Sequence, residues 1–200
     1  LMRHYLSTLQ EIRLLGLKDL PFCWGEVEEC GKDPLENARQ KALAYYRICG
    51  QPVFSQDSGL YIEGLPKERQ PGVHVRRVNG VNLTDEQMRE YYKKIAAEFG
   101  GRCVAQYQNA ICLVFSEDEL YEARGGALNW KKFWLMTEER PQRMEGCPLD
   151  AICADYRTGR HFYDGEATMP EEEGDGVRDF FRNALKQHEM RMANGYDRKI

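Results

Sequence analysis

The chain has 200 residues, of which 42% are hydrophobic and 30% are charged, and its formal net charge is −4. This length suits one domain, or one domain with an added lobe, and is enough to bury a hydrophobic core. The acidic balance gives no basic surface field, which argues against nucleic acid as the main partner, although a local basic cleft could still bind a small anion. No run of about 18 apolar residues indicates a membrane span, and no signal-peptide pattern opens the chain.

Seven cysteines are scattered along the chain, mostly inside apolar segments. Their number is odd, and no C-x-x-C pair indicates a zinc site. We therefore expect reduced thiols that pack in the interior of a cytoplasmic protein.

The first expected elements are a helix, a short strand and an acidic loop. Apolar residues recur at helical spacing through residues 2–15, and Gly16 ends this pattern. Residues 20–24 have the composition of a short strand. Residues 26–31 then include three glutamates, and such a cluster most often forms a solvated surface.

A second helix is predicted over residues 34–49. Asp33 is a good N-cap, Pro34 occupies the first helical position, and Glu36 falls where a capping-box acid belongs. Glu36 therefore has a complete structural explanation. Lys41 does not, because it lies close to the buried stripe of the helix, where a lysine needs an anion or a route to solvent.

Residues 51–65 (QPVFSQDSGLYIEGL) indicate a strand, a tight turn and a second strand, with Asp57 at the bend. A carboxylate on a glycine-containing turn between two strands is well placed for chemistry. Taken alone, the pattern favours the simpler interpretation, in which Asp57 and Ser58 only bond the local backbone of the turn.

The middle of the chain contains a loop and a third helix. Residues 71–77 form a Pro-Gly turn that ends in Arg76 and Arg77, whose guanidinium groups suit phosphate, although an exposed pair is the commoner case. Thr84 with Gln87 then predicts the capped start of a helix, which two glycines end.

The last part of the chain is expected to form a sheet and one helix. Strands are predicted at residues 102–115, 120–123, 132–136 and 151–154. The final helix has an apolar face that includes Val177 and His188, and we interpret His188 as a satisfied edge residue rather than a ligand. Residues 194–200 are expected to form a frayed tail.

Four motifs occur in a fixed order along the first half of the chain. Residues 28–31 (EECG) look like an E-E-T-G loop, and residues 35–42 (LENARQKA) are similar to an F-x-E-N-A-x-x-K-A helix. Residues 56–60 (QDSGL) resemble D-D-S-G-L, and residues 71–77 (PGVHVRR) look like a P-G-x-Y-S-A-R loop. In this order and at these distances, they resemble the inosine triphosphate pyrophosphatase family, also called the Ham1-like nucleoside triphosphate pyrophosphatases.

The resemblance implies an elongated α/β fold with a long mixed β-sheet flanked by helices, two lobes and a central cleft, usually as a homodimer. It implies a single Ham1-like pyrophosphatase domain over residues 1–200. The implied reaction is hydrolysis of a nucleoside triphosphate to monophosphate and pyrophosphate by a metal-activated water. The implied substrates are aberrant purine nucleotides such as ITP, dITP and XTP.

The resemblance also implies Mg²⁺ as cofactor and assigns site residues. Glu28 and Asp57 would bind the metal, and Asp57 would also orient or deprotonate the attacking water. This agrees with general chemistry, because phosphoryl transfer needs charge neutralisation and magnesium prefers few carboxylates with several waters. The substrate would be bound by Lys41, Ser58, Arg76, Arg77, Asp150 and Arg178.

The sequence departs from the family pattern in several places. The T-x-N-x-x-K phosphate loop is missing because the sequence starts after the point where its lysine would fall, so either the chain is incomplete or the protein lacks this loop. Gln56 replaces the first acid of D-D-S-G and leaves Asp57 as the only acid there. The base-binding G-F-G-Y-D-P motif appears as residues 146–151 (GCPLDA), which keep Asp150 but lose the aromatic residue, and the S-H-R motif keeps only Arg178.

Three hypotheses follow from these matches and departures. The leading one is a magnesium-dependent nucleoside triphosphate pyrophosphatase that acts on aberrant purines. The second is a degenerate relative that binds a nucleotide, or another phosphorylated ligand, without hydrolysing it. The third is a hydrolase of another nucleotide class, which the altered base pocket would allow.

Overall fold

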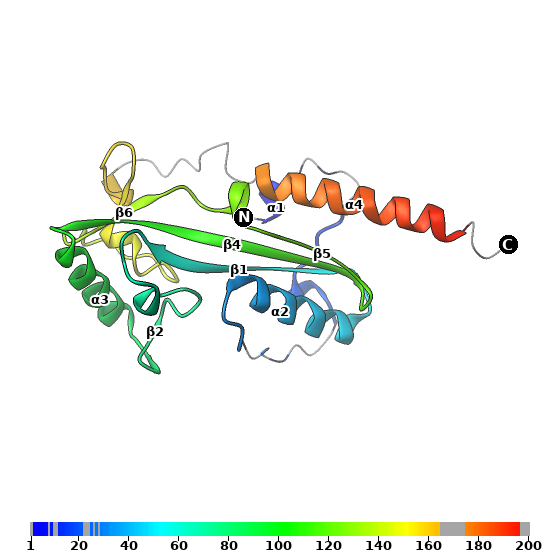
Figure 1. Ribbon diagram of the computed structural model, residues 1–200, viewed down its shortest axis with the longest axis horizontal. Coiled ribbons are helices and arrows are strands. Elements are labelled where there is room, and N and C mark those ends of the chain that lie inside the picture. The colour runs from blue at the N-terminus through cyan, green and yellow to red at the C-terminus, as the bar shows by residue number, and fades with distance from the viewer. Residues whose placement is uncertain are drawn as a thin grey trace. The chain divides into compact units, whose positions relative to one another are not determined.

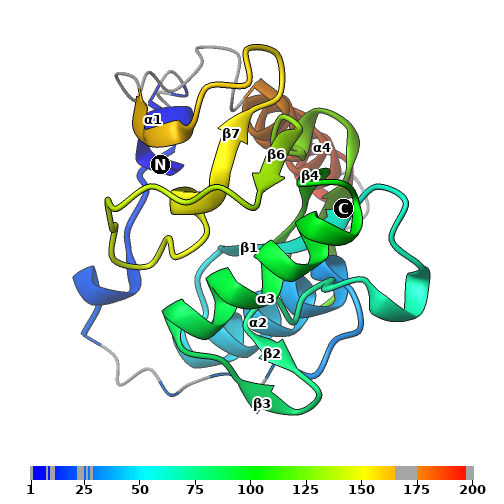
Figure 2. The same cartoon turned by 90° about the vertical axis from the view of Figure 1, so that its left-hand side faces the viewer.

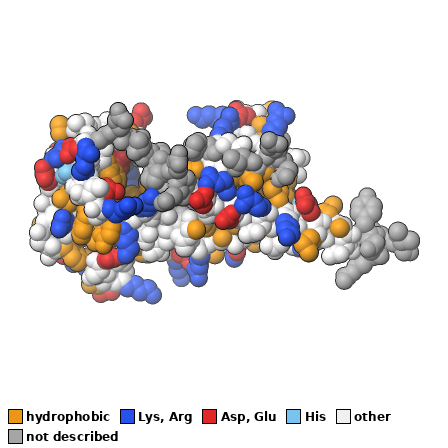
Figure 3. All heavy atoms as spheres, turned by 90° about the horizontal axis from the view of Figure 1, so that it is seen from above, with side chains coloured by type: hydrophobic (Ala, Val, Ile, Leu, Met, Phe, Trp, Pro, Cys, Tyr) orange, Lys and Arg blue, Asp and Glu red, His pale blue; other side chains and the backbone are white. Residues whose placement is uncertain are grey.

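The computed structural model describes residues 2–7, 9, 12–21, 25, 27, 29–164 and 175–196. The chain forms two compact units. The first unit comprises residues 1–57, 109–128 and 170–200, and the second comprises residues 58–108 and 129–169. No helix in these described residues is long and apolar enough to cross a membrane. Lys and Arg side chains are interspersed with Asp and Glu on the face drawn in Figure 3.

A five-stranded sheet has the order β1-β4-β6-β7, with β5 paired to β4. In the first unit, β4 (Arg102–Ser116) pairs antiparallel with β5 (Glu119–Arg124) from Ala110 onward. In the second unit, β4 pairs antiparallel with β6 (Phe133–Met136), and β6 pairs with β7 (Cys153–Asp155). The first three strands predicted in this part of the chain are confirmed, and so is an α/β fold whose sheet is flanked by helices.

The first unit has helices on both faces of its strands (Figure 1). On β4, Ile111 and Leu113 face a core formed with α4 (Asp175–Tyr196). Cys112 and Val114 alternate with them and face α2 (Pro34–Cys49). This alternation explains why residues 110–115 are all apolar, since a strand covered on both faces buries every side chain.

The second unit packs α3 (Asp85–Glu98) against the sheet, as Figure 2 shows, and Tyr92 and Ile95 are buried at this contact. The predicted capping box is confirmed, because Thr84 accepts from the Gln87 amide and the Gln87 side chain accepts from the Thr84 amide. A small hairpin of β2 (Arg77–Val78) and β3 (Val81–Asn82) precedes this helix.

The prediction for residues 51–65 was wrong about the turn. Residues Val53–Ile62 form one continuous strand, β1, which passes straight through Asp57. Gly59 allows two backbone segments to approach each other closely and does not form a bend. A Cβ on Gly59 would lie 3.0 Å from the backbone of Gly72. The two backbones are bridged at this point, with Leu60 and Gly72 exchanging hydrogen bonds of 2.9 and 3.0 Å.

Four other predicted elements differ from the structure. The first helix, α1, covers only Met2–Tyr5, and residues 12–16 are not helical. Ile12 and Leu14 are partly buried against the core that includes α4, whereas Leu15 is exposed, so this stretch has no continuous buried helical face. The predicted strand at 20–24 lies partly outside the described residues, and residues 20–21 form a bend. At 151–154 a 3₁₀ turn (Asp150–Ile152) precedes β7, and α4 continues to Tyr196 instead of fraying at residue 194.

Candidate active site

Helix α2 presents its first two turns to β1, and its start is fixed by local capping. Asp33 accepts hydrogen bonds from the amides of Leu35 and Glu36 at 2.9 and 3.0 Å, which confirms it as the N-cap. Glu36 accepts from the amide of Lys32 at 2.8 Å, one residue before the position that a capping box uses. The residues just before the helix are therefore hydrogen-bonded to its first turn through both Lys32 and Asp33.

Two side chains of α2 meet Asp57 of β1. Lys41 Nζ lies 2.7 Å from Asp57 Oδ1, and Asn37 Nδ2 donates to Asp57 Oδ2 at 3.2 Å. Lys41 Nζ also lies 3.1 Å from a carboxylate oxygen of Glu29 in the acidic loop. The side chains of Lys41 and Asp57 are only 18% and 12% exposed, so this ion pair is largely shielded from water.

The pKa of Lys41 reflects two opposing effects, burial and the two neighbouring carboxylates. Burial alone would lower the pKa of the ammonium group, but the hydrogen bonds and charges of Asp57 and Glu29 outweigh it and raise the pKa above its usual value. Lys41 is therefore protonated throughout the physiological range. One ammonium group between two carboxylates leaves the three residues with a net negative charge, which favours a further cation.

Gly31 allows the acidic loop to approach α2 closely. A Cβ on Gly31 would lie 2.4 Å from Asn37 Oδ1 and 2.8 Å from the Asn37 backbone nitrogen. The Gly31 amide donates to Asn37 Oδ1 at 2.8 Å, so the close approach and the hydrogen bond are parts of one contact. The end of the loop is thereby held against the first turn of the helix.

Gly31→Ala should therefore destabilise the protein by about 1–3 kcal/mol, because the added methyl group must displace packed backbone. The free energy of unfolding in urea measures this change. Gly25→Ala is the matched control in the same stretch, because a Cβ there has no atom within 4 Å. Equal stability of the two variants would contradict the described contact.

The residues at Asp57 fit a magnesium ion that is held together with a substrate. Each oxygen of Asp57 accepts one of the hydrogen bonds given above and has a second lone pair. Within the described ranges, no three His, Cys, Asp or Glu side chains are grouped so as to hold a metal by themselves. Magnesium needs no such group, since one or two carboxylates, waters and substrate phosphates usually complete its shell. Glu28, the other predicted ligand, lies outside the described residues.

Four predicted substrate-binding residues belong to the second unit: Ser58, Arg76, Arg77 and Asp150. Arg76 donates to the Leu83 carbonyl oxygen at 2.9 Å and to Asp85 at 2.7 Å, so it is engaged at the start of α3. Arg77 is exposed and lies 3.5 Å from Asn82 Oδ1. Asp150 is half-buried, and desolvation raises the pKa of its carboxyl group.

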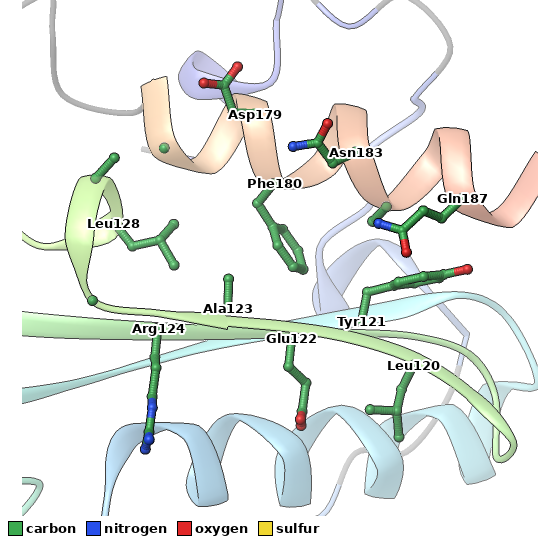
Figure 4. A pocket seen from close by; sticks show the side chains of 14 residues that line it. Leu120, Tyr121, Glu122, Ala123, Arg124, Leu128, Asp179, Phe180, Asn183 and Gln187 are labelled. Carbon is green, nitrogen blue, oxygen red and sulfur yellow. The ribbon is translucent and has the colours of Figure 1, made fainter.

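Arg178, in the first unit, forms an ion pair with Asp175 within the first turn of α4. A cavity of about 520 Å³ lies between α4 and β5. Phe180 and Ala123 face each other across it, as Figure 4 shows. The cavity includes none of the predicted site residues, so its size alone does not make it the reactive centre.

Sequence reasoning missed two members of the cluster. Asn37 was not assigned, although it stands four residues before Lys41 and therefore on the same helix face. Glu29 was not assigned either, and its carboxylate contacts Lys41 Nζ. His188 was interpreted correctly, because it contacts Glu119 at 2.9 Å and stacks on Phe115 with ring centroids 3.9 Å apart.

The fold and the site define an α/β protein with a shielded ammonium–carboxylate cluster between α2 and β1. The chain belongs to the Ham1 family, whose family model matches residues 2–128. It is 44% identical over 73 residues to a protein named dITP/XTP pyrophosphatase from Geobacter sulfurreducens, a match that covers 36% of this chain and 35% of that protein. A Deinococcus deserti protein of the same name is 34% identical over 115 residues, which cover 56% of this chain and 50% of that protein. The chain thus spans about a third to a half of these curated relatives.

Solved structures show the same fold over more of the chain. The Ham1 protein of Staphylococcus aureus aligns with a TM-score of 0.59 and 22% identity, covering 96% of this chain and 93% of that one. A protein from Mycobacterium abscessus, titled nucleoside-triphosphatase and dITP/XTP pyrophosphatase, aligns with a TM-score of 0.60 and 24% identity, covering 92% and 89%. At these identities, the alignments establish the fold alone.

Proposed function

We propose that this protein is a nucleoside triphosphate pyrophosphatase that converts nucleoside or deoxynucleoside triphosphates to monophosphate and pyrophosphate. Aberrant purine nucleotides such as ITP, dITP and XTP are the proposed substrates. The observation that carries the proposal is the shielded contact between Lys41 and Asp57, which lies on two motifs of a Ham1-family chain. The names of the curated relatives support the choice of substrates.

The proposed mechanism relies on charge and position. Asp57 orients the attacking water and accepts its proton, and Lys41 stabilises the charge on the phosphate oxygens. Mg²⁺, held by Asp57 and Glu28, would neutralise the phosphates and lower the pKa of bound water. The remaining proposed substrate contacts are Ser58, Arg76, Arg77, Asp150 and Arg178. We further propose a cytoplasmic homodimer with no nucleic-acid partner.

A substrate panel tests the activity and the metal together. The purified protein is incubated with ITP, dITP, XTP, ATP and GTP, with magnesium or with EDTA, and pyrophosphate and phosphate are measured separately. We expect pyrophosphate from the aberrant purines, with magnesium only. Release of single phosphates, or equal rates in EDTA, would contradict the proposal.

A second candidate is a protein that binds nucleotide without hydrolysing it. Cys147, which is half-buried, falls within the motif where the family pattern has aromatic residues that could stack on a base. Thermal stabilisation by a nucleotide without any turnover would favour this candidate. Turnover of a nucleotide outside the purine set would instead indicate a hydrolase of another nucleotide class.

A further inference from the structure

We propose that Asn37 is a positioning residue, which holds the Asp57 carboxylate and the end of the acidic loop in one fixed arrangement. Its side chain is buried, with 2% of the residue exposed, and both ends of its amide group are bonded. Oδ1 accepts from the Gly31 amide at 2.8 Å, and Nδ2 donates to Asp57 Oδ2 at 3.2 Å. This inference rests on the proposed pyrophosphatase function.

The bonding partners determine which way the amide group points. The backbone N–H of Gly31 can only donate, so the side-chain oxygen of Asn37 must face it. The NH₂ group then faces Asp57, whose ionised carboxylate can only accept. A flipped amide would lose both hydrogen bonds, and the buried position leaves no water to replace them.

Asn37 and Lys41 together fix the orientation of the Asp57 carboxylate. Lys41 binds one carboxylate oxygen and Asn37 binds the other, and both come from the same face of α2. With one donor on each oxygen, the carboxylate cannot rotate without breaking a hydrogen bond. A group that must orient water depends on this kind of support, because small displacements of a reacting group are costly.

Two substitutions distinguish positioning from simple anchoring of the loop. Asn37→Asp keeps an acceptor for Gly31 but loses the donor to Asp57, whereas Asn37→Ala removes both contacts without adding a charge. Hydrogen exchange at the Gly31 amide reports whether that contact survives in each folded variant. The carboxylate that Asn37→Asp adds also repels Asp57, so the uncharged Asn37→Ala variant carries the test of positioning.

Asn109→Asp is the matched control in the same unit. Asn109 is also buried and donates to the Leu128 carbonyl oxygen at 2.6 Å, but it belongs to neither α2 nor the acidic loop. We expect this change to lower thermal stability while leaving the kcat of the folded protein within about twofold of the wild type.

The test of this proposal measures kcat and KM for ITP with magnesium, per folded protein. The wild type is compared with Asn37→Asp, Asn37→Ala and Asn109→Asp. Positioning predicts that Asn37→Asp and Asn37→Ala each lower kcat by about 10–100-fold while KM changes less than about threefold. A kcat within threefold of the wild type in either variant overturns the inference, and the alanine variant decides the matter if the aspartate variant does not fold. A wild-type protein that releases no pyrophosphate instead overturns the proposed function, and this inference with it.

Discussion

Asp57→Asn is expected to lower the rate of pyrophosphate release by about 10²–10⁴-fold, the range for loss of a general base. Asparagine has nearly the same shape and can still accept a hydrogen bond from Lys41. It cannot accept the proton of water, and it carries no charge for a cation. Initial rates with ITP and magnesium measure the effect, with thermal unfolding to show that the variant is folded.

Asp179→Asn provides the control for this change. Asp179 is exposed on α4 and pairs with Arg182 at 2.7 Å, and exposed pairs of this kind contribute little to stability. The Asp179→Asn variant should release pyrophosphate at the wild-type rate. A full rate in Asp57→Asn as well would remove Asp57 from the mechanism.

Lys41→Met is the second change with a large expected effect. It removes the ammonium group and leaves Asp57 and Glu29 without the cation that both of them contact. We expect kcat/KM to fall by about 10²–10³-fold, as on loss of one preorganised charge-stabilising donor. We also expect a loss of about 1–3 kcal/mol in unfolding free energy, because a partly buried charge loses its partner.

Lys41→Arg separates the effect of the positive charge from the effect of the side chain's shape. The variant keeps the charge and should recover stability better than activity.

The stabilisation by Lys41 also depends on pH. Since folding raises the pKa of Lys41, its contribution is fully present below the unfolded value near 10.5 and is lost as the pH rises through the folded value. Urea unfolding should therefore show a constant difference between wild type and Lys41→Met from pH 7 to 9 that shrinks above pH 10.5. A difference that grows above pH 10.5 would contradict this ion pair.

Local signals predicted α2 and the position of Lys41 correctly. The N-cap Asp33, the following proline and the C-terminal Gly50 act within a few residues, so the sequence pattern alone shows them. Lys41 lies close to an apolar stripe, and its need for an anion follows from that position. The structure provides two such anions, Asp57 and Glu29.

Long-range contacts explain what the pattern could not show. The run from Gln56 to Gly59 has the composition of a turn, but the glycine is there because Gly72 approaches its backbone. Asn37 looked like an ordinary helix residue because its partners, Gly31 and Asp57, come from outside the helix. A local sequence pattern cannot show such contacts between separate segments of the chain.

The cluster of Lys41, Asn37 and Asp57 is the centre of this account, and one measurement tests it most directly. Phosphorus NMR follows ITP with magnesium in the presence of the wild type or Asp57→Asn, so that every phosphorus-containing product is seen. The account predicts equal amounts of monophosphate and pyrophosphate from the wild type and almost none from the variant. Diphosphate and single phosphate as products, or the same products at the same rate from Asp57→Asn, would contradict it.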